Sequence, residues 1–195
     1  MSSFDPKSGE ITVFIKRFGK GVEEWSGQLI ETMHAVTESE IAIDDVRLHI
    51  GGPNGSLQVE PDFMNHFILT AGGIGVTPMA AILEDRIRKV VVGTCTTKTT
   101  LIWTTRALEE ISAFSYLFHA VADLPEAERA LFDIRVFKTG TTGDEDIEAH
   151  ATLGAVKISS GRPDFGSVIG TVVLSANPKS RTGVYTFGPE AMTDA

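Results

Sequence analysis

Cysteine and long apolar runs are the scarcest features of this 195-residue chain. Cys95 is the only cysteine, so an internal disulfide and a cysteine-rich zinc site are excluded, and a partly buried thiol in a reducing compartment is expected. No apolar stretch approaches the ~20 residues that a membrane-spanning helix needs. The opening residues, Met-Ser-Ser-Phe-Asp-Pro, do not resemble a signal peptide. The chain as given is therefore expected to be soluble and cytosolic.

Basic residues are also in the minority. The chain has 17 lysines and arginines against 26 acidic residues, a formal net charge of -9. This balance would repel the phosphates of nucleic acid, and no basic run suggests binding to an anionic membrane. The histidines are scattered without metal-ligand spacing, so no metal site is predicted. Any anion-binding site must therefore be local.

Hydrophobic residues make up 42% of the chain, which is enough for a real core. The pattern predicts a first unit over residues 1–60, with a strand over 10–17, a helix over 24–36 and a strand over 46–50. The acidic, proline-containing segment 58–62 is the expected boundary.

The second unit, residues 61–195, alternates strands and helices, which is typical of an α/β fold with a parallel sheet and helices on both faces. No definite pattern covers residues 157 and 158. The expected elements are, in chain order, a strand over 67–71, a helix over 77–92, a strand over 98–105, a helix over 107–122, a strand over 132–138, a helix over 164–174 and a strand over 183–187.

A glycine-rich turn joins the first strand of this unit to its first helix. Its glycines permit positive φ and close backbone approach, and free N–H groups at a helix start can meet phosphate oxygens. Pro78 suits the first turn of a helix, and Thr77 adds a hydroxyl. The order differs from the usual Gly-x-Gly-x-x-Gly, so a tight turn without a ligand is the alternative. The predicted pyrophosphate cradle consists of Gly72, Gly73, Ile74, Gly75, Val76, Thr77 and Pro78.

The end of the strand over 98–105 delivers polar side chains to the same carboxyl edge of the sheet. Thr104 and Thr105 supply hydroxyls, and Arg106 supplies a guanidinium. An NAD-selective site commonly has an acidic residue here, whereas the planar fork of Arg106 fits a 2'-phosphate. The pattern favours NADP(H) over NAD(H), and the alternative for Arg106 is a solvated charge at a helix start.

Five segments together resemble the NADPH oxidase and ferric reductase flavoproteins, which are ferredoxin-NADP reductase-like enzymes. They are Gly52–Ser56, Ala71–Pro78, Ile102–Arg106, Gly161–Phe165 and Gly188–Pro189 with Met192. The resemblance covers nearly the whole chain, and its Ile-Trp-x-x-Arg and Gly-Arg-Pro-Asp motifs are typical of the oxidase and reductase branch. It implies an FAD-binding β-barrel followed by a domain that presents NADPH to the flavin, which passes electrons on to a haem or metal acceptor.

The resemblance also implies a set of cofactor contacts. Ser26 resembles the family's hydroxyl that contacts the FAD pyrophosphate, and it lies where the sequence predicts the first turn of a helix. Thr105, Arg106 and Arg162 resemble contacts to the adenosine phosphate, and Phe187 begins a loop that resembles the one beside the nicotinamide. The alternatives are a plain turn around Arg162 and a core aromatic at Phe187. The remaining implied contacts are Thr104, Gly161, Pro163, Gly188, Pro189 and Met192.

Three departures from the family pattern bear on activity. Phe187 stands where the family usually has cysteine. Residues 2–6 look like the segment just after the family's His-Pro-Phe-Ser/Thr flavin motif, and the chain stops before the family's terminal aromatic. Residues 1–60 are therefore interpreted as a truncated FAD-barrel remnant with weak or absent FAD binding, and residues 61–195 as the NAD(P)-binding domain.

Two functions are compatible with these features. The first is the NADPH-binding module of a flavin-dependent oxidoreductase, whose parent protein would carry a membrane haem domain and place this part on the cytosolic face. The second is a non-catalytic nucleotide-binding remnant or interaction module without a competent flavin site. In the first, the cofactors supply the chemistry and the protein supplies orientation.

Overall fold

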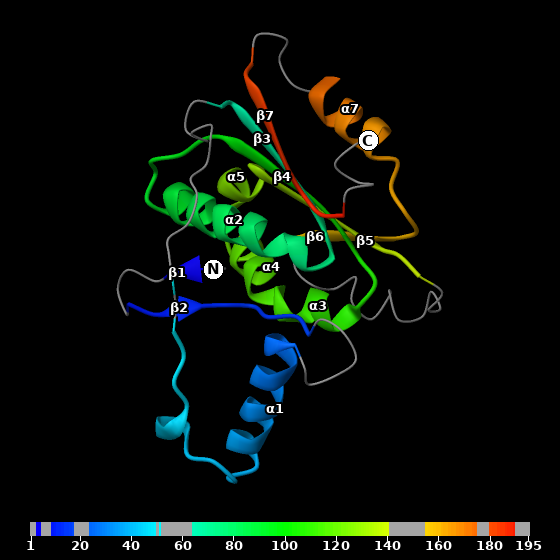
Figure 1. Cartoon of the computed structure of the whole chain (residues 1–195). Helices are drawn as coiled ribbons and strands as arrows, with labels where there is room; N and C mark the ends of the chain where they lie inside the picture. The colour runs from blue at the N-terminus through cyan, green and yellow to red at the C-terminus, as the bar shows by residue number, and fades with distance from the viewer. Residues whose placement is uncertain are drawn as a thin grey trace. The chain divides into compact units, whose positions relative to one another are not determined.

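The chain divides into two units in the computed structural model, which describes residues 3–4, 9–17, 24–49, 51, 64–140, 155–174 and 180–189 (Figure 1). One unit is formed by residues 13–59, and the other by residues 1–12 together with 60–195.

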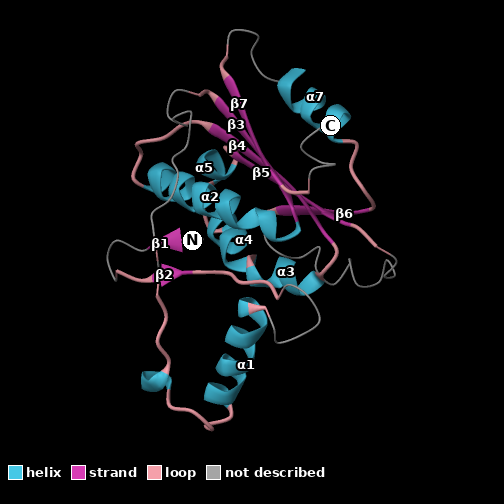
Figure 2. Cartoon of the chain, in the orientation of Figure 1, coloured by secondary structure: helices cyan, strands magenta, loops and turns pink. Residues whose placement is uncertain are grey.

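The larger unit is built on a five-stranded sheet with the strand order β6-β5-β4-β3-β7 (Figure 2). Every neighbouring pair is parallel, so the five carboxyl ends meet at one edge. The central strands are buried on both faces, which explains their nearly continuous apolar and β-branched sequences. The strands are β3 (His66–Gly72), β4 (Lys98–Thr105), β5 (Phe132–Lys138), β6 (Val156–Ser160) and β7 (Thr182–Phe187).

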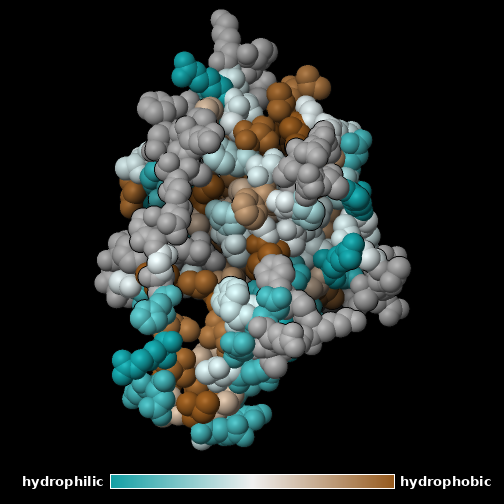
Figure 3. Space-filling model, viewed as in Figure 1, coloured by the Kyte–Doolittle hydropathy of each residue, from teal (hydrophilic) through white to brown (hydrophobic). Residues whose placement is uncertain are grey.

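Helices cover both faces of this sheet, which confirms the predicted α/β arrangement (Figure 1). One face carries α2 (Val76–Val91), α3 (Leu108–Ala113) and α4 (Ser115–Ala122), and α5 (Glu126–Arg129) is a short turn of helix before β5. The other face carries α7 (Phe165–Leu174), which packs on β3 and β4. Apolar atoms also reach the surface over α7 (Figure 3), where Val173 and Leu174 are exposed.

The helix predicted over residues 107–122 is interrupted. Phe114 separates α3 from α4 with φ -104° and ψ 8°, and its ring makes an edge contact with the indole of Trp103, with ring centroids 5.6 Å apart. The apolar stripe continues across the break, because Ile111 and Leu117 are buried on either side of it. The periodicity was therefore compatible with a single helix, and the prediction of one was wrong.

The strand predicted over residues 10–17 is also wrong in extent. Only Ile11–Thr12 forms a strand, β2, which pairs antiparallel with β1 (Ser3–Phe4). Ile11, Val13 and Ile15 are exposed, so this β-branched segment has no apolar surface to cover it. Strand propensity depends on such a surface.

The smaller unit confirms the predicted helix, which is α1 (Trp25–Thr37). The strand predicted over residues 46–50 is wrong for 46–49, which form no strand and follow a 3-10 turn at Ile43–Asp45; residue 50 lies outside the described residues. The described residues of this unit include no strand, so a partial FAD barrel is not shown.

The remaining elements of the larger unit follow the prediction, except that β6 fills the segment around residues 157 and 158, where no pattern was recognised. The sequence also predicts a polar, acidic loop over residues 139–149, which lies largely outside the described residues. Across the described ranges, no helix is long and apolar enough to span a membrane, and no group of three acidic, histidine or cysteine side chains is arranged to hold a metal ion.

Candidate functional site

The glycine turn lies at the carboxyl end of β3. Gly73–Gly75 forms a 3-10 turn, η3, which runs directly into α2. Gly73 adopts φ +53°, in the left-handed region that favours glycine. Thr77 and Pro78 lie half-buried in the first turn of α2. Backbone N–H groups at the start of α2 are bonded to the carbonyl oxygens of Gly73 and Ile74. The positive end of the α2 dipole therefore lies at the carboxyl edge of the sheet, where an anion can be bound.

Gly75 lies against the end of β7. A Cβ atom at Gly75 would lie 2.5 Å from the carbonyl oxygen of Phe187 and 3.1 Å from its ring atom Cδ1. Only glycine allows the two backbones to approach so closely. Phe187 is 57% exposed, so it is not the core aromatic considered as an alternative. The turn and the segment Phe187–Pro189 therefore lie side by side.

Trp103 anchors the turn from within the domain. Its indole is fully buried on the α2 face of β4, and Nε1 donates a hydrogen bond of 2.9 Å to the carbonyl oxygen of Gly73. The Phe114 ring braces the indole from the side, at the break between α3 and α4. Trp103 belongs to the Ile-Trp-x-x-Arg motif, whose pattern predicts no separate role for the tryptophan.

The end of β4 contributes one half-buried hydroxyl, one buried hydroxyl and an exposed cation. Thr104 donates a hydrogen bond to the carbonyl oxygen of Ala71 on β3. The Thr105 hydroxyl is buried, donates a short hydrogen bond to the carboxylate of Glu110 and accepts one from the N–H of Ala107. Thr105 thus fixes the start of α3, and Arg106 between them is exposed.

The Gly161–Pro163 loop follows β6 at the same edge. Gly161 has φ +91°, and its N–H donates a 2.8 Å hydrogen bond to the carbonyl oxygen of Lys138, the last residue of β5. Arg162 is exposed and Pro163 is buried. The loop ends at Asp164, whose carboxylate accepts a hydrogen bond from the N–H of Ser167 in the first turn of α7.

Two predicted contacts are not part of this constellation as described. Ser26 is the second residue of α1 and is buried within the smaller unit. Met192 lies outside the described residues. The remaining predicted contacts occupy the ends of β3, β4, β6 and β7.

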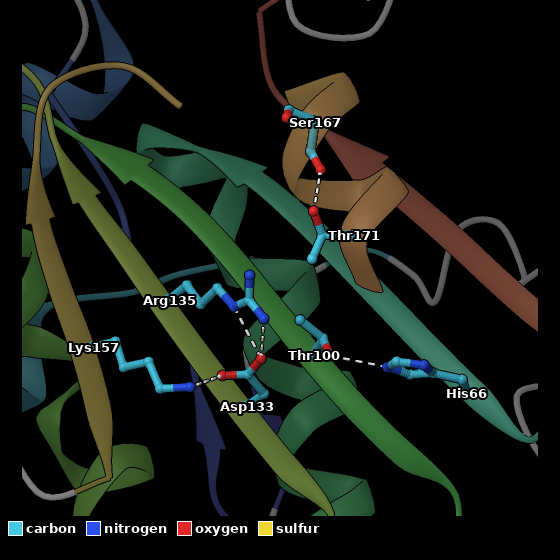
Figure 4. A network of polar contacts seen from close by, with 7 residues as sticks. All are labelled: His66, Thr100, Asp133, Arg135, Lys157, Ser167 and Thr171. Atoms are coloured by element: carbon cyan, nitrogen blue, oxygen red, sulfur yellow. Dashed lines mark hydrogen bonds and ion pairs between the residues drawn. The ribbon is translucent and has the colours of Figure 1, made fainter. Parts of the chain in front are cut away.

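A polar network lies on the α7 face, in the half of the sheet nearest the amino ends of its strands (Figure 4). His66 Nε2 and the Thr100 hydroxyl are 2.9 Å apart and buried. Asp133 accepts hydrogen bonds of 2.6 and 2.9 Å from Arg135 and one of 2.9 Å from Lys157. Burial and then Lys98 lower the pKa of His66, and Asp133 opposes them only in part. The network lies at the opposite end of the strands from the glycine turn.

The Asp133→Asn variant is expected to lose pH-dependent stability. Burial raises the pKa of the Asp133 carboxyl, but Arg135 and Lys157 outweigh it and leave the pKa below its ordinary value. The stabilisation is therefore present above the unfolded pKa of about 3.9 and is lost as pH falls through the folded value. At pH 7 the free energy of unfolding should fall by about 1–3 kcal/mol.

Urea unfolding of the wild type and the variant between pH 3 and 7 measures this difference, which should shrink below about pH 4. Asp123→Asn, at an exposed aspartate, is the matched control and should change stability by no more than about 0.5 kcal/mol. A difference that is constant across the range would contradict the assignment.

These features define a class of domain. A parallel sheet whose first strand passes through a glycine turn into a helix, with further loops at the same carboxyl edge, is the arrangement of dinucleotide-binding α/β domains. The model of the ferric reductase NAD-binding domain family matches residues 64–195. The chain belongs to this family, and the predicted resemblance is confirmed.

Several known proteins are similar over part of their length. Mouse NADPH oxidase 1 is 28% identical over 162 residues, covering 75% of this chain and 27% of the mouse protein. Ferric reduction oxidase 2 of Arabidopsis thaliana is 28% identical over 181 residues, covering 90% of this chain and 23% of the plant protein. A flavohemoglobin structure from Malassezia yamatoensis aligns with a TM-score of 0.43 and 20% identity, covering 69% of this chain and 27% of that chain. The chain thus spans about a quarter of the length of these relatives.

Proposed function

We propose that this chain is the NADPH-binding module of a flavin-dependent oxidoreductase, which holds NADPH so that its hydride can pass to FAD. The observation that carries the proposal is the glycine turn, held by Trp103 from one side and by the end of β7 from the other. Two exposed arginines, Arg106 and Arg162, follow strands at the same edge. Membership of the ferric reductase NAD-binding family supports a nicotinamide dinucleotide as the ligand.

Each part of the edge has a distinct task in this proposal. The backbone of the turn Gly73–Gly75 would hold the pyrophosphate, where the start of α2 favours negative charge. Arg106 and Arg162 would contact the adenosine phosphate, so the site would prefer NADPH to NADH. Thr105 would act through α3, because its hydroxyl is already bonded within the protein. Phe187, Gly188 and Pro189 would lie beside the nicotinamide.

Hydride transfer itself is chemistry that NADPH and flavin supply when both are bound. The contribution of this chain would be to orient the nicotinamide and exclude water around it. The exposed Phe187 ring lies next to Gly75 and would form an apolar wall on one side of that site. FAD contact through Ser26 and an FAD-binding segment over residues 1–60 belong to the same proposal. So does a parent protein that has a membrane haem domain and places this part on its cytosolic face.

A non-catalytic nucleotide-binding module is the second candidate. It is favoured by the described residues of the smaller unit, which include one helix and a 3-10 turn but no strand that could form a flavin barrel. The two candidates differ in one measurable respect, which is flavin reduction. Both require NADPH binding.

The purified full chain is expected to bind NADPH more tightly than NADH in a calorimetric titration. The Arg106→Ala variant should bind NADPH about 10–100-fold more weakly with little change for NADH, because charge-assisted hydrogen bonds to the 2'-phosphate are lost. Arg181→Ala, at an exposed arginine near the amino end of β7, is the matched control and should bind as the wild type does.

Addition of FAD under anaerobic conditions then separates the two candidates. NADPH-dependent bleaching of the flavin absorbance supports the oxidoreductase module, and binding without bleaching supports the non-catalytic module. A wild-type chain that binds neither nicotinamide nucleotide would refute both. An Arg106→Ala variant with an unchanged preference for NADPH would refute the role of Arg106.

A further inference from the structure

Lys138 is a buried lysine at the carboxyl edge of the sheet that the sequence analysis did not single out. It is the last residue of β5 and is only 3% exposed. It is aligned with Thr105 on β4 and with Ser160 on β6. Arg106 follows directly after Thr105, and the Gly161 N–H that precedes Arg162 is bonded to the Lys138 carbonyl oxygen. Lys138 therefore lies between the two strand ends that carry the exposed arginines.

The charge of Lys138 has no counterpart in the described part of the protein. No carboxylate there forms an ion pair with its Nζ, and no side-chain acceptor bonds to it, although the chain carries a net charge of -9. The carboxylate of Glu110, in α3, accepts a hydrogen bond from the Thr105 hydroxyl. A lysine side chain is rarely buried to this extent unless it is paired or functional.

We propose that Lys138 is the central cation of a phosphate site at this edge, flanked by Arg106 and Arg162, and that it binds the 2'-phosphate of NADPH. The inference rests on the proposed function and adds a residue that determines cofactor specificity. Three cations at or just beyond the ends of three adjacent strands suit a phosphomonoester, which carries a charge of about -1.5 to -2 at neutral pH. NADH lacks this group.

The strand order separates this site from the pyrophosphate cradle. The glycine turn follows β3, and β4 lies between β3 and β5. An anion at Lys138 must therefore be a different group from the one at the glycine turn. In a single dinucleotide ligand, the 2'-phosphate is the group that meets this requirement.

Titration with two adenosine nucleotides tests the proposal on the full chain. Adenosine 2',5'-bisphosphate carries the 2'-phosphate, and adenosine 5'-monophosphate lacks it. Lys138→Met should weaken binding of the bisphosphate by about 10–100-fold and leave binding of the monophosphate within about twofold. Lys138→Arg should retain most of the affinity for the bisphosphate. Lys98→Met, an exposed lysine at the amino end of β4, is the matched control and should bind both nucleotides as the wild type does.

Thermal unfolding without ligand separates a binding role from a structural one. If Lys138 serves the ligand, Lys138→Met should unfold at the wild-type temperature or above it, because the substitution removes no ion pair of the described part of the protein and keeps an apolar side chain of similar length. A variant with lower stability and unchanged nucleotide affinities would overturn the proposal and assign Lys138 to the core. A wild-type chain that binds NADPH while Lys138→Met retains full affinity for the bisphosphate overturns the role of Lys138 alone. A wild-type chain that binds no nucleotide overturns the proposed function as well.

Discussion

Replacing Gly75 with alanine is expected to destabilise the larger unit by about 1–3 kcal/mol and to weaken NADPH binding more than tenfold. The new methyl group would lie 2.5 Å from the carbonyl oxygen of Phe187. Because that atom belongs to the backbone of β7, no side-chain rotation can relieve the overlap, and the turn must separate from the strand. The backbone of Gly75 itself has an ordinary φ of -60°, so the cost comes from close approach rather than from φ.

Denaturant unfolding and NADPH titration measure both effects. Gly170→Ala in α7 is the matched control, because nothing lies within 4 Å of a Cβ atom there, and it should stabilise the protein by about 0.5–1 kcal/mol. Adding Phe187→Ala to Gly75→Ala removes only the ring contact at 3.1 Å. Recovery of stability in that double variant would show that the ring, and not the backbone, restricts this position.

The Trp103→Phe variant is expected to lower the free energy of unfolding by about 2–4 kcal/mol, and nucleotide binding should weaken with it. The substitution keeps an aromatic ring near Phe114 but removes the N–H that bonds to the Gly73 carbonyl oxygen. That carbonyl then loses its side-chain donor and keeps only the backbone hydrogen bond within the turn, and the smaller ring leaves unfilled volume. Because the lost bond acts on the glycine turn, hydrogen exchange of the Gly73 to Gly75 amides should become faster.

The chain offers a matched control for this substitution. Trp25, the only other tryptophan, is 64% exposed, and Trp25→Phe should change stability by no more than about 0.5 kcal/mol. Fluorescence separates the two residues, since the buried Trp103 should emit at shorter wavelength than Trp25. If Trp103→Phe lowers the stability but leaves hydrogen exchange of the turn amides unchanged, Trp103 contributes only packing and does not hold the turn.

The sequence alone was sufficient for the parallel sheet, because its central strands are short runs of apolar and β-branched residues. The boundaries predicted for β4 and β5 match the structure. The break at Phe114 could not be predicted, since it depends on the Trp103 indole, 11 residues earlier, and leaves the helical periodicity intact. The strand predicted over residues 10–17 was wrong because its β-branched residues have strand propensity but the segment pairs with another strand only at Ile11–Thr12.

The parts of the candidate site that contain the glycine turn and the two exposed arginines could be predicted from the sequence. The glycine turn, Arg106 and Arg162 all lie at the carboxyl edge, as the alternation of strands and helices required. Lys138 was missed because a lysine that ends a strand normally marks a solvent-exposed end. Its burial depends on β6 beside it, and β6 was the strand without a recognisable sequence pattern.

The strand order also determines the distance over which the functional segments are spread along the edge of the sheet. The two outermost strands of the sheet are β6 and β7, and four strand intervals separate them. Arg162 follows the end of β6, and the glycine turn lies beside the end of β7. The functional segments therefore form a row along this edge. At about 4.8 Å per interval, the row of functional segments extends over roughly 19 Å. A mononucleotide can touch only part of such a row, whereas an extended dinucleotide can lie along most of it. The width of the sheet therefore sets the length that a ligand needs. Only a ligand that extends across four strand intervals can contact every functional segment at once.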